Sequence, residues 1–306
     1  MALTDRYINP LTDFGFKKLF GDELNKELLI DFLNQLLPEK HKIKELNYKK
    51  SEYLPSGEYE RKAIFDLYCE SLNGEKFIVE VQRAKQNYFK DRSVYYSSFP
   101  IQQQAIKGSD WDFRLEAVYT IGILDFSFEE DKDDNSYLHT VQLKNQLNKV
   151  FFDKLTYIYI ELPKFEKSLD LLESKTDKWL FVFKHLARLQ DRPAALQEKI
   201  YEKLFAAAEI AKFSDVERGM YEESLKYYRD LKNVVDTAFE EGEEKGKMEG
   251  KMEGKMEGMI EGRKEGKMEG KLEGKLGVAI IMRAKGIEPS LIAEVTGLSK
   301  EDIDRL

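Results

Sequence analysis

This chain has very little cysteine and no long apolar run. Among its 306 residues there is one cysteine, Cys69, so a framework of disulfides within the chain is excluded. No stretch approaches the roughly 20 consecutive apolar residues that a membrane-spanning helix requires. The first residues also lack the basic and then apolar pattern of a secretion leader. We therefore expect a cytoplasmic protein that has no membrane partner.

An excess of positive charge is missing as well. The formal net charge is −8, whereas proteins that coat duplex DNA usually carry a basic surface. Tight, non-specific coating of DNA is therefore disfavoured. Basic residues can still line a single cleft, and a site that holds metal ions needs acidic groups in any case. With 42% hydrophobic and 12% aromatic residues, the chain has enough apolar material for a packed core.

The order of apolar patterns predicts a mixed α/β core in residues 1–165. Apolar residues with i, i+3, i+4 spacing predict a helix that ends at Pro38. Three stretches with the composition of strands follow. A helical stretch then covers residues 85–107, and apolar strands are predicted near residues 115–126 and 155–162. The core therefore begins with the order helix, three strands, helix, strand.

Two of the predicted strands carry acidic residues. Asp66 lies in the middle of the strand predicted for residues 64–70, and the turn residues 72–75 join it to a strand that contains Glu80 and Gln82. Because side chains alternate along a strand, Glu80 and Gln82 share one face. A carboxylate among apolar neighbours is costly unless it has a partner. Two carboxylates that meet across a hairpin predict a cation, for which Mg²⁺ is the natural candidate and Mn²⁺ an alternative.

Three further segments are predicted after residue 165: a helical extension in residues 166–240, a linker in residues 241–277 and a tail in residues 278–306. The linker repeats Gly-Lys-Met-Glu with a period of four. Each glycine costs a helix about 1 kcal/mol, whereas the Lys/Glu pairs favour helix. The linker is either a solvated, partly helical or disordered connection, or a segment that holds a homo-oligomer together through residues 240–306.

The tail resembles a small helix–turn–helix unit. Short apolar helices are separated by Gly286 and Gly297, and a tight turn between two such helices is the shape of a known DNA-binding motif. The same pattern suits a small capping or docking unit. The sequence leaves both interpretations open.

The arrangement of Asp66 followed by Glu80-x-Gln82, in this order of helices and strands, resembles the PD-(D/E)XK nuclease superfamily. Other stretches resemble its transposase-like, recombination-promoting nuclease branch: NPLTDFGFKKLFG in residues 9–21, DRSVYY in residues 91–96, ELPKF in residues 161–165, and the tail rich in Gly, Lys and Glu. The resemblance implies a restriction-endonuclease-like core, followed by the helical region and the repetitive tail.

The resemblance also implies metal-dependent hydrolysis of phosphodiester bonds in DNA, linked to recombination or mobile elements. Asp66 and Glu80 would bind one or two Mg²⁺ ions, which polarise the scissile phosphate and lower the pKa of the attacking water. Gln82 occupies the position where the superfamily usually has lysine. Glutamine is known there in this branch; it can hydrogen-bond water but carries no charge.

Other residues are assigned supporting roles. Lys62 is a candidate for the missing positive charge, and Arg92 and Tyr95 are candidates for phosphate contacts. Asp13 is expected to serve as the N-cap of the first helix. A competing hypothesis is a catalytically inactive DNA-binding or oligomerising protein that keeps the nuclease fold, because a fold alone does not establish a function.

Overall fold

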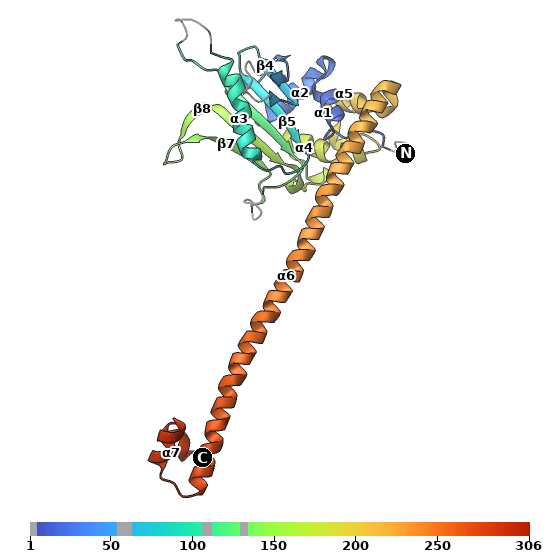
Figure 1. The fold of residues 1–306 in the computed structure, drawn as a ribbon. Coiled ribbons are helices and arrows are strands. Elements are labelled where there is room, and N and C mark those ends of the chain that lie inside the picture. The colour runs from blue at the N-terminus through green and yellow to red at the C-terminus, as the bar shows by residue number, and fades with distance from the viewer. Residues whose placement is uncertain (1–4, 54–62, 106–111, 129–133) are drawn as a thin grey trace. The chain divides into compact units, whose positions relative to one another are not determined.

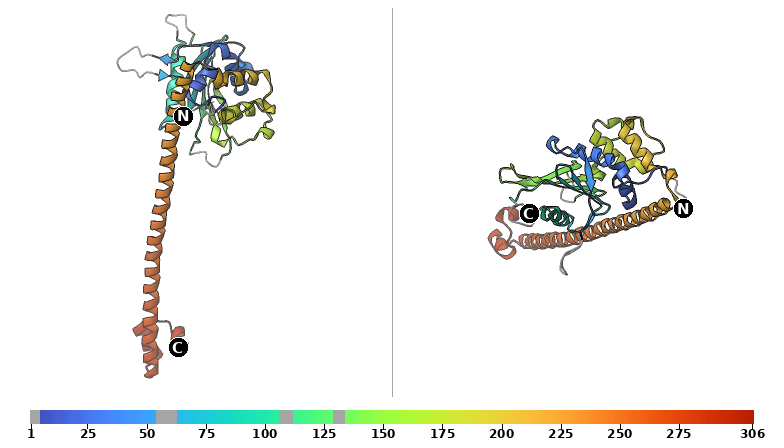
Figure 2. Two further views of the ribbon diagram at one scale, coloured as in Figure 1. Left: turned by 90° about the vertical axis from the view of Figure 1, so that its right-hand side faces the viewer. Right: turned by 90° about the horizontal axis from the view of Figure 1, so that it is seen from above.

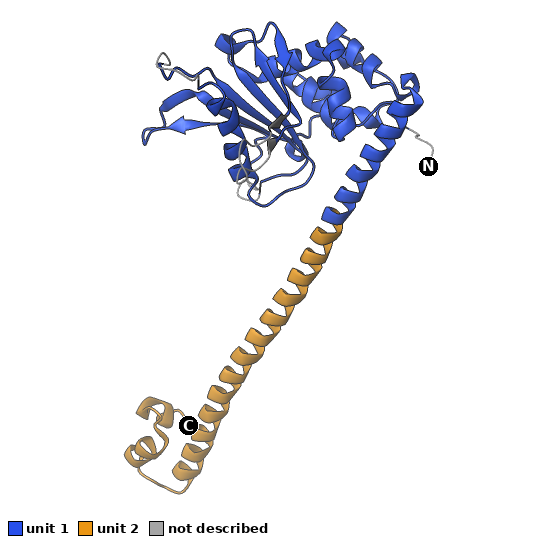
Figure 3. Cartoon of the chain, turned by 45° about the horizontal axis from the view of Figure 1, so that its top comes forward, with its two compact units in different colours: residues 1–235 blue, residues 236–306 orange. Residues whose placement is uncertain are grey.

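The computed structural model describes residues 5–53, 63–105, 112–128 and 134–306. The chain divides into two compact units, residues 1–235 and 236–306, which are coloured separately in Figure 3. Each unit is described by itself below. The segment boundaries after residues 165, 240 and 277 stay a prediction.

A mixed sheet of six strands forms the centre of the first unit, in the order β1-β4-β5-β6-β8-β7. Parallel pairing joins β5 to β6 and β6 to β8, and the other neighbours are antiparallel. A separate antiparallel pair consists of β2 and β3. The strands are β1 Leu46–Tyr48, β2 Glu52–Tyr53, β3 Ala63–Ile64, β4 Leu67–Ser71, β5 Lys76–Gln82, β6 Val118–Leu124, β7 Leu138–Lys144 and β8 Val150–Glu161.

Helices cover both faces of this sheet (Figures 1 and 2). One face packs against α1 Asp13–Phe20, α2 Lys26–Leu36, α4 Lys175–His185 and α5 Lys199–Ala208, whereas the other face packs against α3 Phe89–Gln102. Short 3-10 helices connect these elements at Glu23–Asn25, Glu39–His41, Leu162–Lys164, Leu169–Leu171, Leu186–Arg188, Ala194–Leu196 and Ile210–Lys212.

Strand β5 shows how the sheet separates its two faces. Phe77, Val79 and Val81 enter the large apolar core beneath α1, α2, α4 and α5. Glu80 and Gln82 therefore lie on the other face, the one that carries α3, because side chains alternate along a strand. The predicted hairpin is confirmed, since β4 pairs with β5 in antiparallel register. The predicted common face of Glu80 and Gln82 follows from the same geometry.

One local prediction was wrong, and one strand was missed. Asp66 does not lie in the middle of a strand: the chain bends there, between the end of β3 at Ile64 and the start of β4 at Leu67. Strand β7 was not predicted. Its side chains are half-buried or exposed along the whole strand, so it lacks the alternation of buried and exposed residues that identifies a strand in a sequence.

The second unit contains the later part of α6 Asp215–Ala284, together with α7 Pro289–Thr296 and α8 Lys300–Asp304. The repeat lies within α6, and side chains from residue 241 to residue 274 are exposed. A small apolar cluster of Ala279, Ile292, Leu298 and Ile303 joins the three helices. No helix among the described residues is both long enough and apolar enough to cross a membrane.

Candidate active site

The register of the β4–β5 hairpin brings Asp66 and Glu80 together. Leu67 pairs with Val79, so Asp66, one residue earlier, lies beside Glu80, one residue later. The backbone N–H of Asp66 donates a hydrogen bond to Glu80 Oε1 at 3.1 Å, and the backbone N–H of Val81 donates to Asp66 Oδ2 at 2.7 Å. Each carboxylate is therefore held by a backbone donor of the neighbouring segment.

Gln82 completes this group of three polar side chains. Its Nε2 lies 3.3 Å from Glu80 Oε2 and donates to it, and both side chains are nearly buried, with 9% and 8% of their surface exposed. The structure thus places Asp66, Glu80 and Gln82 in one cluster on the α3 face of the sheet. We refer to these three residues as the carboxylate cluster.

The surroundings of the cluster oppose its ionisation. Burial raises the pKa of Glu80 to about 8, and the negative charge of Asp66 contributes, although the Asp66 N–H, Arg92 and Gln82 act in the opposite direction. Burial also raises the pKa of Asp66; the Val81 N–H opposes this effect. Carboxyl groups whose ionisation is opposed by burial and by a neighbouring negative charge are typical of functional sites.

Helix α3 contributes two side chains to the surroundings of the cluster. Arg92 and Tyr96 line one small cavity with Glu80, and the positive charge of Arg92 lowers the pKa of Glu80. Burial raises the pKa of Tyr96, and Arg92 lowers it, while the charges of Glu80 and Asp66 raise it further.

Tyr95, the residue predicted to contact phosphate, lies apart from this cavity. It is 44% exposed, and its ring packs edge-to-face on Phe99 at 5.1 Å. Spacing alone does not distinguish the two tyrosines, because residues three and four apart are both neighbours on a helix surface, and Tyr95 and Tyr96 stand at these two distances from Arg92.

A glycine makes room for this packing. Gly122 of β6 pairs with Glu80 of β5. A Cβ atom at Gly122 would lie 3.0 Å from the Tyr159 ring and 3.5 Å from that of Phe89. The absence of a side chain at this position lets the two aromatic rings close over the sheet beside Glu80.

Comparison with known proteins identifies the family. A family model described as PD-(D/E)XK nuclease family transposase matches residues 10–238. The chain belongs to this nuclease family. No match was found among curated proteins or among solved structures. The resemblance drawn from the sequence motifs is confirmed, and the match includes the whole carboxylate cluster.

Gln82 occupies the position where the superfamily usually has lysine, so any positive charge near the cluster comes from other residues. Lys62, the predicted source, lies outside the described residues. The charges of Arg83 and Lys17 both lower the pKa of Asp66, so these two cations lie within electrostatic reach of the cluster. Neither was assigned a role at the cluster from the sequence; Arg83 directly follows Gln82, whereas Lys17 reaches the cluster only through the folding of a distant segment.

The prediction that Asp13 is the N-cap of the first helix was wrong. The N-cap of α1 is Thr12, whose Oγ1 accepts a hydrogen bond from the Gly15 N–H at 3.0 Å. Asp13 is the first residue of the helix, and its negative charge raises the pKa of Asp66. The acidic surroundings of the carboxylate cluster therefore extend to α1.

The donor atoms of the cluster suit a hard divalent cation. Carboxylate oxygens of Asp66 and Glu80, with the amide oxygen of Gln82 as a further donor, match the preference of Mg²⁺, which keeps several waters of its own. A dication would also stabilise the ionised forms of both side chains, which burial disfavours. Within the described ranges, no group of three or more His, Cys, Asp or Glu side chains is placed to hold a metal.

Proposed function

We propose that the protein is a Mg²⁺-dependent DNA endonuclease whose catalytic residues are Asp66, Glu80 and Gln82. The observation that carries this proposal is the pair of carboxylates Asp66 and Glu80, whose ionisation is opposed by burial and which are held by backbone donors. Such a pair costs stability unless a cation or a proton neutralises it. Membership of a nuclease family makes a metal ion and a DNA phosphate the fitting ligands.

When bound, Mg²⁺ polarises the scissile phosphate and lowers the pKa of a water molecule, and Mn²⁺ can supply the same chemistry. Asp66 and Glu80 hold the metal. The Val81 N–H fixes the orientation of the Asp66 carboxylate, and the Asp66 N–H fixes that of Glu80. Gln82 orients the attacking water by a hydrogen bond.

The cations around the cluster have a separate role. Arg92 on one side, and Arg83 and Lys17 near Asp66, provide positive charge for a DNA phosphate. They stand in for the lysine that the superfamily usually places at the Gln82 position. The family name links the reaction to transposition or recombination.

A plasmid-cleavage assay tests the proposal. Supercoiled plasmid is incubated with the full-length protein, with Mg²⁺ or with EDTA, and nicked and linear products are measured. The Asp66→Asn variant keeps the shape of the side chain but removes its charge, and we expect it to lose at least about a hundredfold in rate, as loss of a metal-ligand charge does. The matched control is Asp153→Asn, which breaks an exposed ion pair with Lys40. Equal cleavage by wild type and Asp66→Asn would rule the assignment out.

A non-catalytic protein that keeps the fold is the second candidate. It is favoured by Gln82, which donates to Glu80 and brings no charge to the cluster. This candidate predicts no saturable binding of Mg²⁺ in a calorimetric titration. Saturable binding by the wild type that is lost in Glu80→Ala would exclude it.

A further inference from the structure

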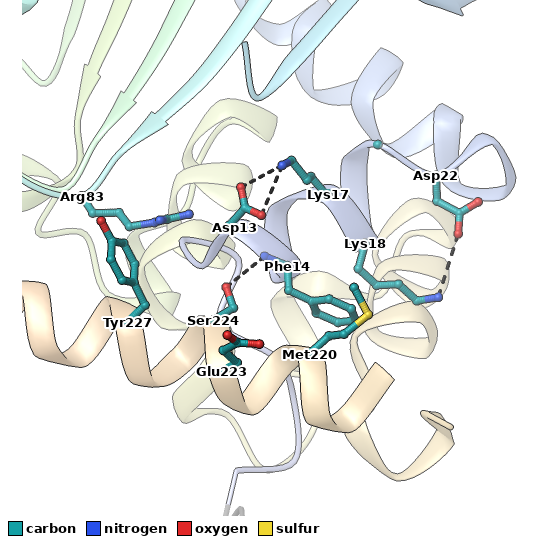
Figure 4. Close-up of a pocket in the computed structure, with 11 residues that line it drawn as sticks. Asp13, Phe14, Lys17, Lys18, Asp22, Arg83, Met220, Glu223, Ser224 and Tyr227 are labelled. Carbon is teal, nitrogen blue, oxygen red and sulfur yellow. Dashed lines mark hydrogen bonds and ion pairs between the residues drawn. The ribbon is translucent and has the colours of Figure 1, made fainter. Parts of the chain in front are cut away.

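A pocket of about 850 Å³ lies in the first unit, between α1 and residues 220–227 of α6 (Figure 4). Phe14 and Lys17 line it from α1, and Arg83 lines it from the end of β5. Met220 and Tyr227 line it from α6. Two long-range hydrogen bonds fix the walls: the Phe14 N–H donates to Ser224 Oγ at 3.1 Å, and the Tyr221 hydroxyl accepts from the Asn9 N–H at 2.9 Å.

Three residues of the pocket wall lie within electrostatic reach of the carboxylate cluster. Arg83 follows Gln82 directly in the sequence, and the charges of Asp13, Arg83 and Lys17 all act on Asp66. All three residues also line the pocket. The pocket is therefore near enough to Asp66 to receive the part of a ligand that neighbours a group held at the cluster.

Charges in the pocket are balanced rather than positive. Lys17 Nζ lies 3.0 Å from Asp13 Oδ1, and Lys18 Nζ lies 3.9 Å from Asp22 Oδ2, as the dashed lines in Figure 4 show. Arg83 Nε donates to the Leu11 carbonyl at 2.8 Å, which anchors its guanidinium at the pocket wall. Extended contact with the two charged backbones of a duplex favours an excess of positive charge, which this balance does not offer.

Apolar surface is the second feature of the pocket. Met220 is 56% exposed and Tyr227 is 61% exposed, and their spacing of seven residues places them on one face of α6. An exposed tyrosine ring is a typical platform on which a nucleobase stacks. The pocket thus combines a ring face and a thioether with an arginine and a lysine, which suits a ligand with one flat apolar part and one anionic group.

We propose that this pocket receives one unpaired nucleotide of the DNA strand, next to the phosphate at the carboxylate cluster. The base stacks on Tyr227, and the phosphate contacts Arg83 and Lys17. In a duplex both faces of a base are covered by its neighbours, so only an unpaired or extruded base offers a free ring face. The choice of DNA rests on the proposed function, and the substrate class is unpaired or locally opened DNA.

Binding without metal tests the proposal. The full-length protein is titrated in EDTA, so that cleavage does not occur, with a fluorescein-labelled oligodeoxythymidine of about 12 nucleotides, a length typical of single-strand sites. The same strand annealed to its complement is the duplex probe. We expect the single strand to bind at least about tenfold more tightly than the duplex. Tyr227→Ala should weaken binding of the single strand by about 5- to 150-fold, the range measured for loss of one base–aromatic stack.

Matched variants separate the pocket from general effects. Tyr227→Phe keeps the ring and should keep the affinity, whereas Phe151→Ala removes an aromatic ring that is 81% exposed on β8 and should change nothing. Lys17→Ala should weaken binding, but Lys247→Ala, which breaks an exposed ion pair of the same i,i+4 spacing, should not. If Tyr227→Ala does not fold, Met220→Glu, which adds a carboxylate to the pocket wall, takes its place.

The outcomes distinguish this inference from the nuclease assignment. A wild type that binds through Tyr227 but does not cleave with Mg²⁺ contradicts only the nuclease assignment. Equal affinities of wild type and Tyr227→Ala, or a duplex that binds as tightly as the single strand, overturn the inference even if plasmid is cleaved. Tighter binding of the matching RNA strand overturns the choice of DNA.

Discussion

Replacing Glu80 by glutamine should stabilise the metal-free protein at alkaline pH. The pKa of Glu80 is raised from 4.5 to about 8 by burial and by Asp66, so the folded state holds a proton that the unfolded state has lost. The free energy of unfolding is therefore highest when the pH is below the pKa of Glu80 in the unfolded chain. It falls as the pH rises toward the pKa of Glu80 in the folded protein. The Glu80→Gln side chain carries no charge, and its amide oxygen can still accept the Asp66 N–H.

The size of the effect follows from the interval between the two pKa values. Each pH unit over which the two states differ by one proton changes the free energy of unfolding by about 1.4 kcal/mol. Between the pKa of 4.5 and the pKa of about 8, the wild type loses up to roughly 5 kcal/mol of its free energy of unfolding. This value is the upper bound on how much more stable Glu80→Gln should be than the wild type above pH 8. At pH 5 the two proteins should be almost equally stable, because Glu80 is then largely protonated.

Urea unfolding in EDTA between pH 5 and pH 9 measures this difference, and the fluorescence of the buried Trp179 reports on the core of the first unit. Glu75→Gln is the matched control. Burial alone would raise the pKa of Glu75, but hydrogen bonds from Ser71 and His41 outweigh it and lower the pKa. Glu75→Gln should therefore destabilise the protein at neutral pH. A Glu80→Gln variant that is less stable than the wild type at pH 8 would refute the reasoning.

Three other predictions concern the site and the repeat. Gln82→Lys places a cation beside Glu80 and should lower its pKa, so the acidic limb of the pH–rate profile for plasmid cleavage should move to lower pH; an unchanged limb contradicts this. Tyr96→Phe should reduce the cleavage rate whereas Tyr95→Phe should not, because only Tyr96 lies in the cavity beside Glu80; equal effects would argue against a role for α3. If the repeat holds a homo-oligomer, removal of residues 240–306 should abolish self-association in sedimentation experiments. A truncated protein that keeps the same number of chains per particle as the full-length protein would exclude that role.

Much of the arrangement of the carboxylate cluster could be predicted from local sequence patterns. Strand alternation placed Glu80 and Gln82 on one face, and the turn with Gly74, whose φ is +92°, predicted the hairpin that carries them. The prediction that Asp66 meets Glu80 needed only the register of two neighbouring strands. Local patterns suffice where both partners lie within one hairpin, because few geometries are open to a short loop.

The rest of the site depends on contacts between distant segments. Ser224 accepts from the Phe14 N–H, and Tyr228 donates to Asp125 Oδ2 at 2.7 Å. Neither contact has a local signal, since the partners lie far apart in the chain and on different elements. The pocket near the cluster, and the influence of Asp13 on Asp66, could not be predicted for the same reason.

The lack of a lysine at position 82 has a consequence for how metal and pH act together. The nearby cations are each engaged: Arg83 with the Leu11 carbonyl, Lys17 with Asp13, and Arg92 with Gln86. They leave the pKa of Glu80 near 8, so Mg²⁺ must displace a proton to bind below that pH. Metal affinity should then rise by up to about tenfold for each pH unit between pH 6 and pH 8, because binding releases one proton. A lysine in this position would favour the ionised site in advance; with glutamine, a bound metal ion would itself have to bring about the ionised state that the proposed reaction needs.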